Sequence, residues 1–238
     1  MIVIWFTVSC AREYFDLMKK GQIGRPVPPK RCVSQACRRK NCYWRHGSYE
    51  RRVLDGDCSG LVKVERFKCR YCEATISMVP GFLVPKRQHS FRLIAEKCQN
   101  YATDETSYRK EANGPCANPA SSASQIWRWI DLLGRRAGSV LLDVQAEAVM
   151  TGVEEAKLLA ADQCFCPNAE KAKTAAKKAC LEHLAKVVSF GKALFDTEKG
   201  VLNAFGTRNL KNVEMMQRIF AGQGAIFGTP HMVAPVFS

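Results

Sequence analysis

Four cysteines in two pairs are the residues of this 238-residue chain that are best suited to chemistry. Two residues separate Cys69 from Cys72, and four separate Cys32 from Cys37. Two close pairs, with a hairpin-like sequence between them, are typical of a small zinc-binding fold. Each tight turn presents two thiolates to one side of a tetrahedral Zn²⁺ ion. We therefore predict a structural zinc ion held by these four thiolates.

The upstream pair admits two alternatives. Cys37 and Cys42 have the same spacing as Cys32 and Cys37, and His46 could replace one thiolate. Cys42 precedes a strand-like dipeptide, so we expect it to be packed rather than ligating. The chain has twelve cysteines and no recognisable export signal, which favours metal ligation and buried thiols over disulfides.

Positive charge is concentrated in the part of the chain that carries the paired cysteines. The formal net charge is +14. Residues 1–136 hold 25 Lys and Arg against 12 Asp and Glu, whereas residues 137–238 hold 11 against 10. Such a local field attracts polyanions, of which nucleic acid is the commonest, although an acidic membrane or protein could also exploit it. We expect DNA as the partner and no membrane association.

Basic and aromatic residues alternate around the cysteines. Basic side chains neutralise phosphates, and aromatic rings can stack on bases. The interleaved aromatic residues are Tyr43, Trp44, Tyr49 and Tyr71. The predicted phosphate contacts are Arg38, Arg39, Lys40, Arg45, Arg51, Arg52, Lys68, Arg70, Lys86 and Arg87.

The elements that must position these residues suggest an α+β fold. Residues 49–54, 61–68 and 75–79 are strand-like, and turn formers fill 55–60, so we expect a three-stranded antiparallel zinc ribbon. A sheet this small cannot bury a real core, so we expect the metal to supply much of its stability. Residues 1–9 are expected to form a buried strand rather than a signal peptide, which favours a cytoplasmic protein. Residues 11–20 predict a helix that buries Tyr14, Phe15 and Met18.

Three short helices are expected next, as in a helix-turn-helix. They cover residues 91–102, then 105–112 capped by Thr103 and Asp104, and a third that begins with the capping box Ser122 and Gln125 and ends near Gly134. Trp127 and Trp129 are expected in its core. The beginning of a recognition helix usually reaches base edges, so the candidate DNA contacts there are Ser124, Gln125 and Arg128.

The second half of the chain changes character and predicts an all-α domain with an irregular tail. We expect helices over residues 139–161, 167–195 and 208–221, which are suited to homo-oligomer or protein-partner contacts. Asp143, Glu147, Glu154 and Asp162 are spaced like a solvated helix face rather than a two-metal site, so no catalytic residue is predicted. The expected domains are a strand, helix and linker (1–31), zinc ribbon (32–88), helix-turn-helix (89–136) and helical domain (137–238).

The middle of the chain resembles a bacterial family of transposase-like zinc-ribbon proteins that are often found with mobile elements. The resemblance rests on HGSYERR at 46–52, RFKCRYC at 66–72, TISMVPGF at 75–82 and the Arg128-Trp129 pair, and it covers about residues 1–135. It implies DNA binding through a zinc ribbon and a helix-turn-helix, and it supports the ligand set given above. The glycine that often follows the second cysteine pair in that family is Glu73 here.

Three functions follow as expectations. The first is a zinc-dependent DNA-binding protein of a mobile element, acting as a regulator or accessory factor. The second is a truncated or divergent transposase with metal-dependent phosphoryl transfer. The third is a zinc-stabilised protein-interaction adaptor without a DNA partner.

Overall fold

The computed structural model describes residues 2–6, 10–56, 58–84, 87–113 and 122–195. They form two units, one ending at Ser90 and the other beginning at Phe91. The predicted DNA contact Lys86 and the predicted helix at 208–221 lie outside the described residues. Within the described ranges, no helix combines the length and the apolar character that crossing a membrane requires.

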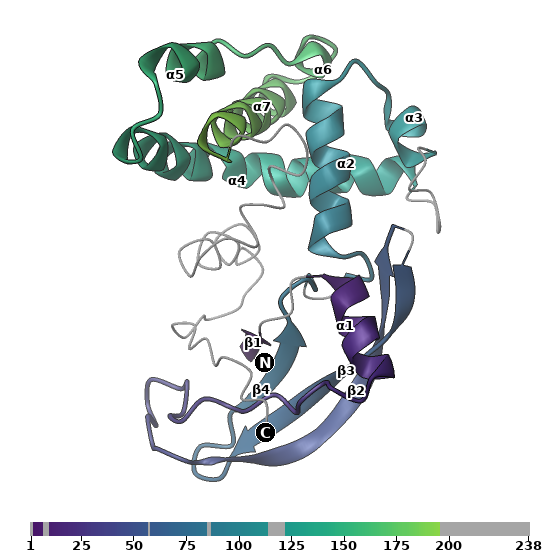
Figure 1. Cartoon of the computed structure of the whole chain (residues 1–238), viewed down its shortest axis with the longest axis vertical. Coiled ribbons are helices and arrows are strands. Elements are labelled where there is room, and N and C mark those ends of the chain that lie inside the picture. Colours follow the sequence, from purple (N-terminus) through teal and green to yellow (C-terminus); the bar gives the residue numbers. More distant parts are fainter. Residues whose placement is uncertain (1, 7–9, 57, 85–86, 114–121, 196–238) are drawn as a thin grey trace. The chain divides into compact units, whose positions relative to one another are not determined.

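The first unit is built on a four-stranded sheet (Figure 1). Strands β2 (Tyr43–Asp55), β3 (Cys58–Cys69) and β4 (Thr75–Pro80) pair antiparallel, which confirms the predicted three-stranded sheet. Strand β1 (Ile2–Phe6) adds a parallel edge to β4, a pairing that the sequence analysis did not predict. The strand order is β1-β4-β3-β2. The loop predicted at 55–60 is too long, because β3 already begins at Cys58.

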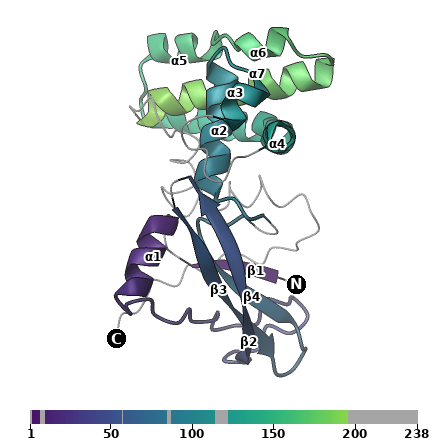
Figure 2. The ribbon, with the colours of Figure 1, turned by 90° about the vertical axis from the view of Figure 1, so that its right-hand side faces the viewer.

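Helix α1 (Ala11–Lys19) covers one face of the β2–β3 hairpin (Figure 2). Tyr14 and Phe15 pack against Val62 and Val64 in one buried cluster. A Cβ on Gly60 would lie 2.6 Å from the Phe15 ring, so the close approach of the helix needs a glycine there. The expectation that this sheet has no real core was wrong, because α1 supplies one.

Met18 was wrongly predicted to be buried. It is 47% exposed, whereas Tyr14 is 3% and Phe15 8% exposed. The helix is only nine residues long, and Met18 lies in its last turn, beside the end of the helix. A short helix buries only the stripe that its neighbour reaches.

The second unit is entirely helical in its described part. It holds α2 (Phe91–Thr103), α3 (Tyr108–Ala112), α4 (Ala123–Met150), α5 (Glu155–Asp162), α6 (Pro167–Glu170) and α7 (Ala175–Phe195). Helix α7 contacts α2, α4, α5 and α6. Helix α3 begins at Tyr108, three residues later than predicted, because Ser107 rather than Thr103 or Asp104 caps it. The helices predicted at 139–161 and 167–195 are each broken, around residues 151–154 and 171–174.

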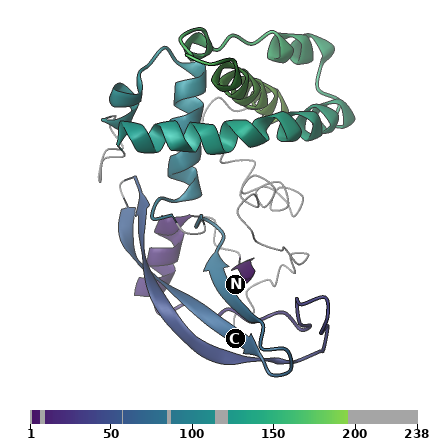
Figure 3. The same cartoon turned by 180° about the vertical axis from the view of Figure 1, so that it is seen from behind.

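Helix α4 does not end near Gly134, as the sequence analysis expected. It continues without a break for 28 residues, visible as the longest coil in Figure 3. A Cβ on Gly134 would lie 2.6 Å from Cβ of Cys180 in α7. The glycine therefore allows two helices to cross closely instead of terminating one. The same helix crosses the boundary at 136/137 that was expected between two domains.

Buried polar groups tie the short helices of this unit together. The Lys97 ammonium donates to the carbonyl of Glu111 at 2.8 Å and lies 3.4 Å from its carboxylate. The Asn168 amide, 2% exposed as a residue, donates to the carbonyls of Tyr101 and Asp104 at the end of α2. These bonds satisfy backbone groups that the end of a helix leaves without an intrahelical partner.

Candidate metal centre

The structure brings the four predicted cysteines into one group. One sulfur atom from each of Cys32, Cys37, Cys69 and Cys72 lies within 4.8 Å of the other three. The sulfurs of Cys32 and Cys72 are 3.5 Å apart, and those of Cys37 and Cys69 are 3.9 Å apart. These four side chains are close enough together to hold a metal ion. The described residues contain no other such group of His, Cys, Asp and Glu side chains.

The two cysteine turns have similar backbones. The residue after the second cysteine of each pair has a positive φ, 47° at Arg38 and 60° at Glu73. Left-handed backbone is favourable for glycine and costs other residues free energy, so the fold must enforce it at both positions. In the second turn, Glu73 N–H donates to the carbonyl of Cys69 at 3.1 Å, and Lys68 pairs with the Glu73 carboxylate at 3.2 Å. These contacts account for the departure from glycine noted in the sequence.

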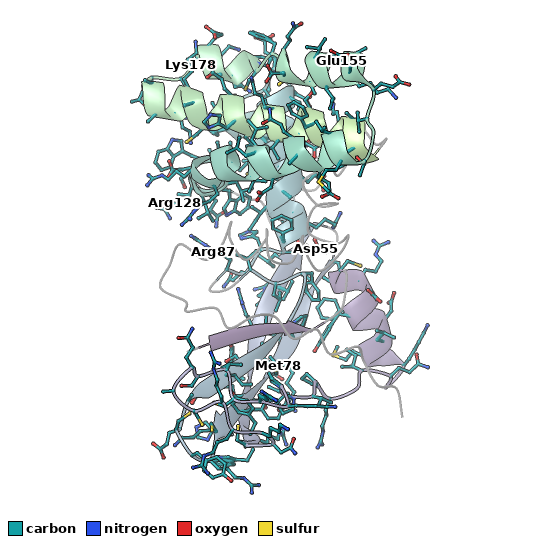
Figure 4. All side chains as sticks on the ribbon, turned by 90° about the vertical axis from the view of Figure 1, so that its left-hand side faces the viewer. Asp55, Met78, Arg87, Arg128, Glu155 and Lys178 are labelled. Atoms are coloured by element: carbon teal, nitrogen blue, oxygen red, sulfur yellow. The ribbon has the colours of Figure 1, made fainter. Side chains whose placement is uncertain are left out.

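The sheet holds both turns in place. Cys69 is the last residue of β3, and Arg70 N–H donates to the carbonyl of Cys42, just before β2 begins. The first turn is anchored by Val33, whose N–H donates to the Tyr43 hydroxyl at 3.0 Å. Val33 and Tyr43 also pack on Met78, which lies on the sheet face away from α1 (Figure 4).

The thiols of Cys32 and Cys69 differ in proton affinity. Burial raises the pKa of Cys32 to about 12, against the opposing effect of a backbone N–H at Ser34. Burial also acts to raise the pKa of Cys69, but backbone N–H groups of Cys72 and Tyr71 and thiol hydrogen bonds lower it to about 6. Cys69 therefore ionises more readily than Cys32 at neutral pH. A bound cation would favour the thiolate form of all four cysteines.

Neither alternative ligand belongs to the group. Cys42 is fully buried beside Cys32 and Cys69, and burial raises its pKa to about 11. His46 is exposed and its ring packs edge-on against Trp44, with the ring centroids 5.3 Å apart. The structure thus distinguishes Cys37, which belongs to the sulfur group, from Cys42 and His46, which do not; the spacing alone could not make this choice.

The predicted phosphate contacts divide into two sets. Several are occupied by contacts within the chain: Arg45 pairs with Glu65 at 2.9 Å, Lys68 with Glu73, and Arg51 donates to the carbonyl of Val84. Others are exposed, and no ion pair of theirs is recorded in the described part of the chain. These are Arg38, Arg39, Lys40, Arg52 and Arg70. Arg87 is half-buried.

Aromatic and basic side chains meet where the two cysteine turns face each other. The Arg39 guanidinium of the first turn lies 4.4 Å from the ring centroid of Tyr71 in the second turn. Tyr71 is 58% exposed, so the ring is partly covered by one cation and otherwise faces solvent. Such a cation–π contact links the turns independently of a metal.

The beginning of α4 presents the other predicted DNA contacts. The capping box is confirmed: the Gln125 side chain accepts from Ser122 N–H at 2.8 Å, and the Ser122 hydroxyl accepts from Gln125 N–H at 3.2 Å. The Ser124 hydroxyl lies 2.9 Å from that of Ser122. Arg128 is exposed, and no ion pair of it is recorded among the described residues (Figure 4).

One tryptophan of α4 differs from the expectation. Trp129 is buried, as predicted, but Trp127 is 47% exposed and lies 4.9 Å below the Lys177 ammonium. The two residues are two positions apart on a helix, so they point to different sides. The acidic side chains set aside above are also spread out: Asp162 pairs with Lys186 at 2.7 Å and Glu154 with Lys157 at 3.9 Å.

A family model described as a domain of unknown function (DUF6431) matches residues 34–127. The match begins within the first cysteine turn, so it includes Cys37, Cys69 and Cys72 but not Cys32, and it ends in the first turns of α4. No curated protein and no solved structure matches the chain. The comparisons therefore show similarity to a domain whose function is not described.

Proposed function

We propose that the protein binds DNA through the surface around its cysteine turns, with Zn²⁺ in the four-sulfur site. The observation that carries this proposal is the set of basic side chains on both turns. Arg38, Arg39 and Lys40 follow the first pair, and Arg70 lies within the second. All four are exposed, and none is neutralised by an ion pair in the described ranges.

The chemistry of the site supports zinc as the metal. Four thiolates with tetrahedral geometry and Zn–S bonds of about 2.3 Å place the sulfurs about 3.8 Å apart. The observed separations of 3.5 Å between Cys32 and Cys72 and 3.9 Å between Cys37 and Cys69 lie on either side of that value. Zn²⁺ would join the turns at a closed site, which is a structural role. It would hold Arg38 and Arg70, 32 positions apart in sequence, on one rigid surface.

The wider assignment rests on the resemblance to transposase-like proteins. We propose a regulatory or accessory role in a mobile element, in which α2, α3 and the beginning of α4 act as a helix-turn-helix. Arg128 is the best placed base contact there, because the Gln125 side chain already caps its own helix. The helical part from residue 137 would then serve a partner or a second copy.

Salt-dependent binding to duplex DNA tests the proposal. Each phosphate contact contributes about 0.9 to the slope of log K against log salt concentration. The double variant Arg38→Ala/Arg70→Ala should therefore reduce the slope by about 1.8 if both side chains contact phosphates. The matched control, Lys157→Ala/Lys173→Ala, removes two exposed cations from the helical unit and should leave the slope unchanged. No binding of the zinc-loaded chain at low salt, or equal slopes for the two double variants, would refute it.

A further inference from the structure

A row of aromatic rings lies along β2, the edge strand of the sheet. Trp44 is 42% exposed and Tyr49 38% exposed, although both are large rings on a well-paired strand. The His46 ring is also exposed and lies against Trp44. Strand β2 pairs only with β3 among the described strands, so its outer edge carries no further strand there.

The pairing register places the rings of Trp44 and Tyr49 on one face. Residues directly opposite each other in an antiparallel pair share a face, and alternate residues of a strand do so too. The opposed pairs are Trp44 with Lys68, Gly47 with Arg66, and Tyr49 with Val64. Since Val64 packs under α1, this row runs from the α1 cluster to Cys69 at the metal site.

A bulge opens a gap in the row. The register shifts between Arg45 and Gly47, so His46 is the extra residue. Gly47 has φ of 111°, and a Cβ placed there would meet no atom within 4 Å. The strand is therefore uncovered at Gly47 in the part of the chain that the structure describes, which allows a flat group to approach it there.

A hydrogen-bond donor without a partner lies opposite the gap. Arg66 faces Gly47 across the strands, and its Nε is buried and has no hydrogen-bond partner among the described residues. No ion pair of Arg66 is recorded in the described part of the chain. Buried polar groups are usually satisfied, so an unsatisfied donor on a partly exposed arginine points to a ligand with acceptor oxygens.

We infer that the face formed by Trp44, His46, Tyr49 and Arg66 binds unpaired bases of single-stranded DNA. The rings would stack on base faces, and Arg66 would donate to a base carbonyl or a phosphate oxygen. Bases in a duplex already stack on each other and cannot offer their faces, so this site selects unpaired DNA. The inference rests on the proposed DNA binding and specifies which form of DNA this face takes.

Binding of a labelled 20-nucleotide single strand and of a duplex of equal length, by fluorescence anisotropy, tests the inference. Stacking on one aromatic ring is worth enough to change affinity by about 5- to 150-fold. Trp44→Ala and Tyr49→Ala should each weaken single-strand binding within that range and change duplex binding less than about 2-fold. Trp44→Phe keeps a stacking ring and should retain most of the affinity.

Leu61→Ala is the matched control. Leu61 is 54% exposed and lies on the same hairpin, but it alternates with Val62 and so points to the other face. Leu61→Ala should change neither the single-strand affinity nor the duplex affinity. The zinc content of each variant is measured as well, to check that the cysteine turns still form.

The outcomes separate this inference from the proposed function. If Trp44→Ala and Tyr49→Ala bind single strands like the unaltered chain, while duplex binding keeps its salt dependence, only the stacking site is refuted. If both variants lose duplex binding as strongly as single-strand binding, the selectivity for unpaired bases is refuted. If the chain binds neither form at low salt, the stacking site and the proposed function fail together.

Discussion

The close crossing of α4 and α7 leads to a prediction about two glycines of the same helix. Alanine is normally the better helix residue, and replacing glycine by alanine within a helix gains about 1 kcal/mol. At Gly134, however, the new Cβ would lie 2.6 Å from Cβ of Cys180, 3.1 Å from its carbonyl oxygen and 3.2 Å from its Cα. These atoms belong to the body of α7 and cannot move aside as a side-chain end can.

Gly134→Ala should therefore destabilise the helical unit. Overpacking of this kind costs about 1 to 3 kcal/mol, and the contacts with fixed atoms favour the upper end. Subtracting the propensity gain leaves a net loss of about 2 kcal/mol in the free energy of unfolding. Gly138→Ala is the matched control, because its Cβ would meet only the exposed His183 ring, at 3.2 Å, and that ring can rotate away. It should be neutral or gain up to about 1 kcal/mol.

Urea unfolding of the full zinc-loaded chain provides the measurement. The helical band of the circular dichroism spectrum follows this unit, because all the described helices except α1 belong to it. The double variant Gly134→Ala/Cys180→Gly removes the Cys180 Cβ that clashes with the new Cβ at residue 134. Its loss of unfolding free energy should therefore be smaller than the sum of the losses of the two single variants. If Gly134→Ala is as stable as Gly138→Ala, the close crossing of α4 and α7 is wrong.

Three further outcomes are expected. Cys72→Ser should reduce bound zinc, measured by mass spectrometry of the metal, to well under one ion per chain, whereas Cys42→Ser should keep a full ion, since Cys42 lies outside the ligand group. Lys97→Met leaves Glu111 buried without its cation and should cost about 3 to 5 kcal/mol in chemical unfolding, and Lys97→Met/Glu111→Leu should recover most of that loss. Burial and a nearby arginine lower the pKa of His89 below its unfolded value of about 6.5. The contribution of neutral His89 to stability is therefore complete above that pH. It falls at lower pH, because the unfolded chain takes up the proton before the folded chain does. In acid titrations, the unfolding free energy of His89→Gln should therefore decrease less steeply below pH 6.5 than that of the unaltered chain.

The cysteine group was the part of the site that the sequence predicted best. A tight turn with two thiolates is a local feature, so spacing alone carries much of the information. The choice between Cys37 and Cys42 was not settled by spacing, because Cys42 follows Cys37 at the same distance as Cys37 follows Cys32. It depends on which sulfur lies close to those of Cys69 and Cys72 once β2 and β3 have paired. The order of residues along the chain does not reveal that pairing.

The wrong prediction of where α4 ends has a physical cause. A sequence of Gly134, two arginines and Gly138 has the composition of a helix end, because glycine weakens a helix in isolation. In the structure, α7 packs on both glycines, and the packing outweighs the propensity. Trp127 is the opposite case: an apolar ring is expected in a core, but its position on α4 leaves it beside Lys177 instead.

The parallel pairing of β1 has a consequence for how the chain folds as it is made. Ile2 pairs with Ile76, so β1 has no partner until 74 further residues have been synthesised. At about 5 to 20 residues per second, that interval is about 4 to 15 s on the ribosome. The second cysteine pair arrives in the same interval. Pairing of β1 with β4 and the meeting of the four cysteines that could hold a metal therefore both wait for the same stretch of chain.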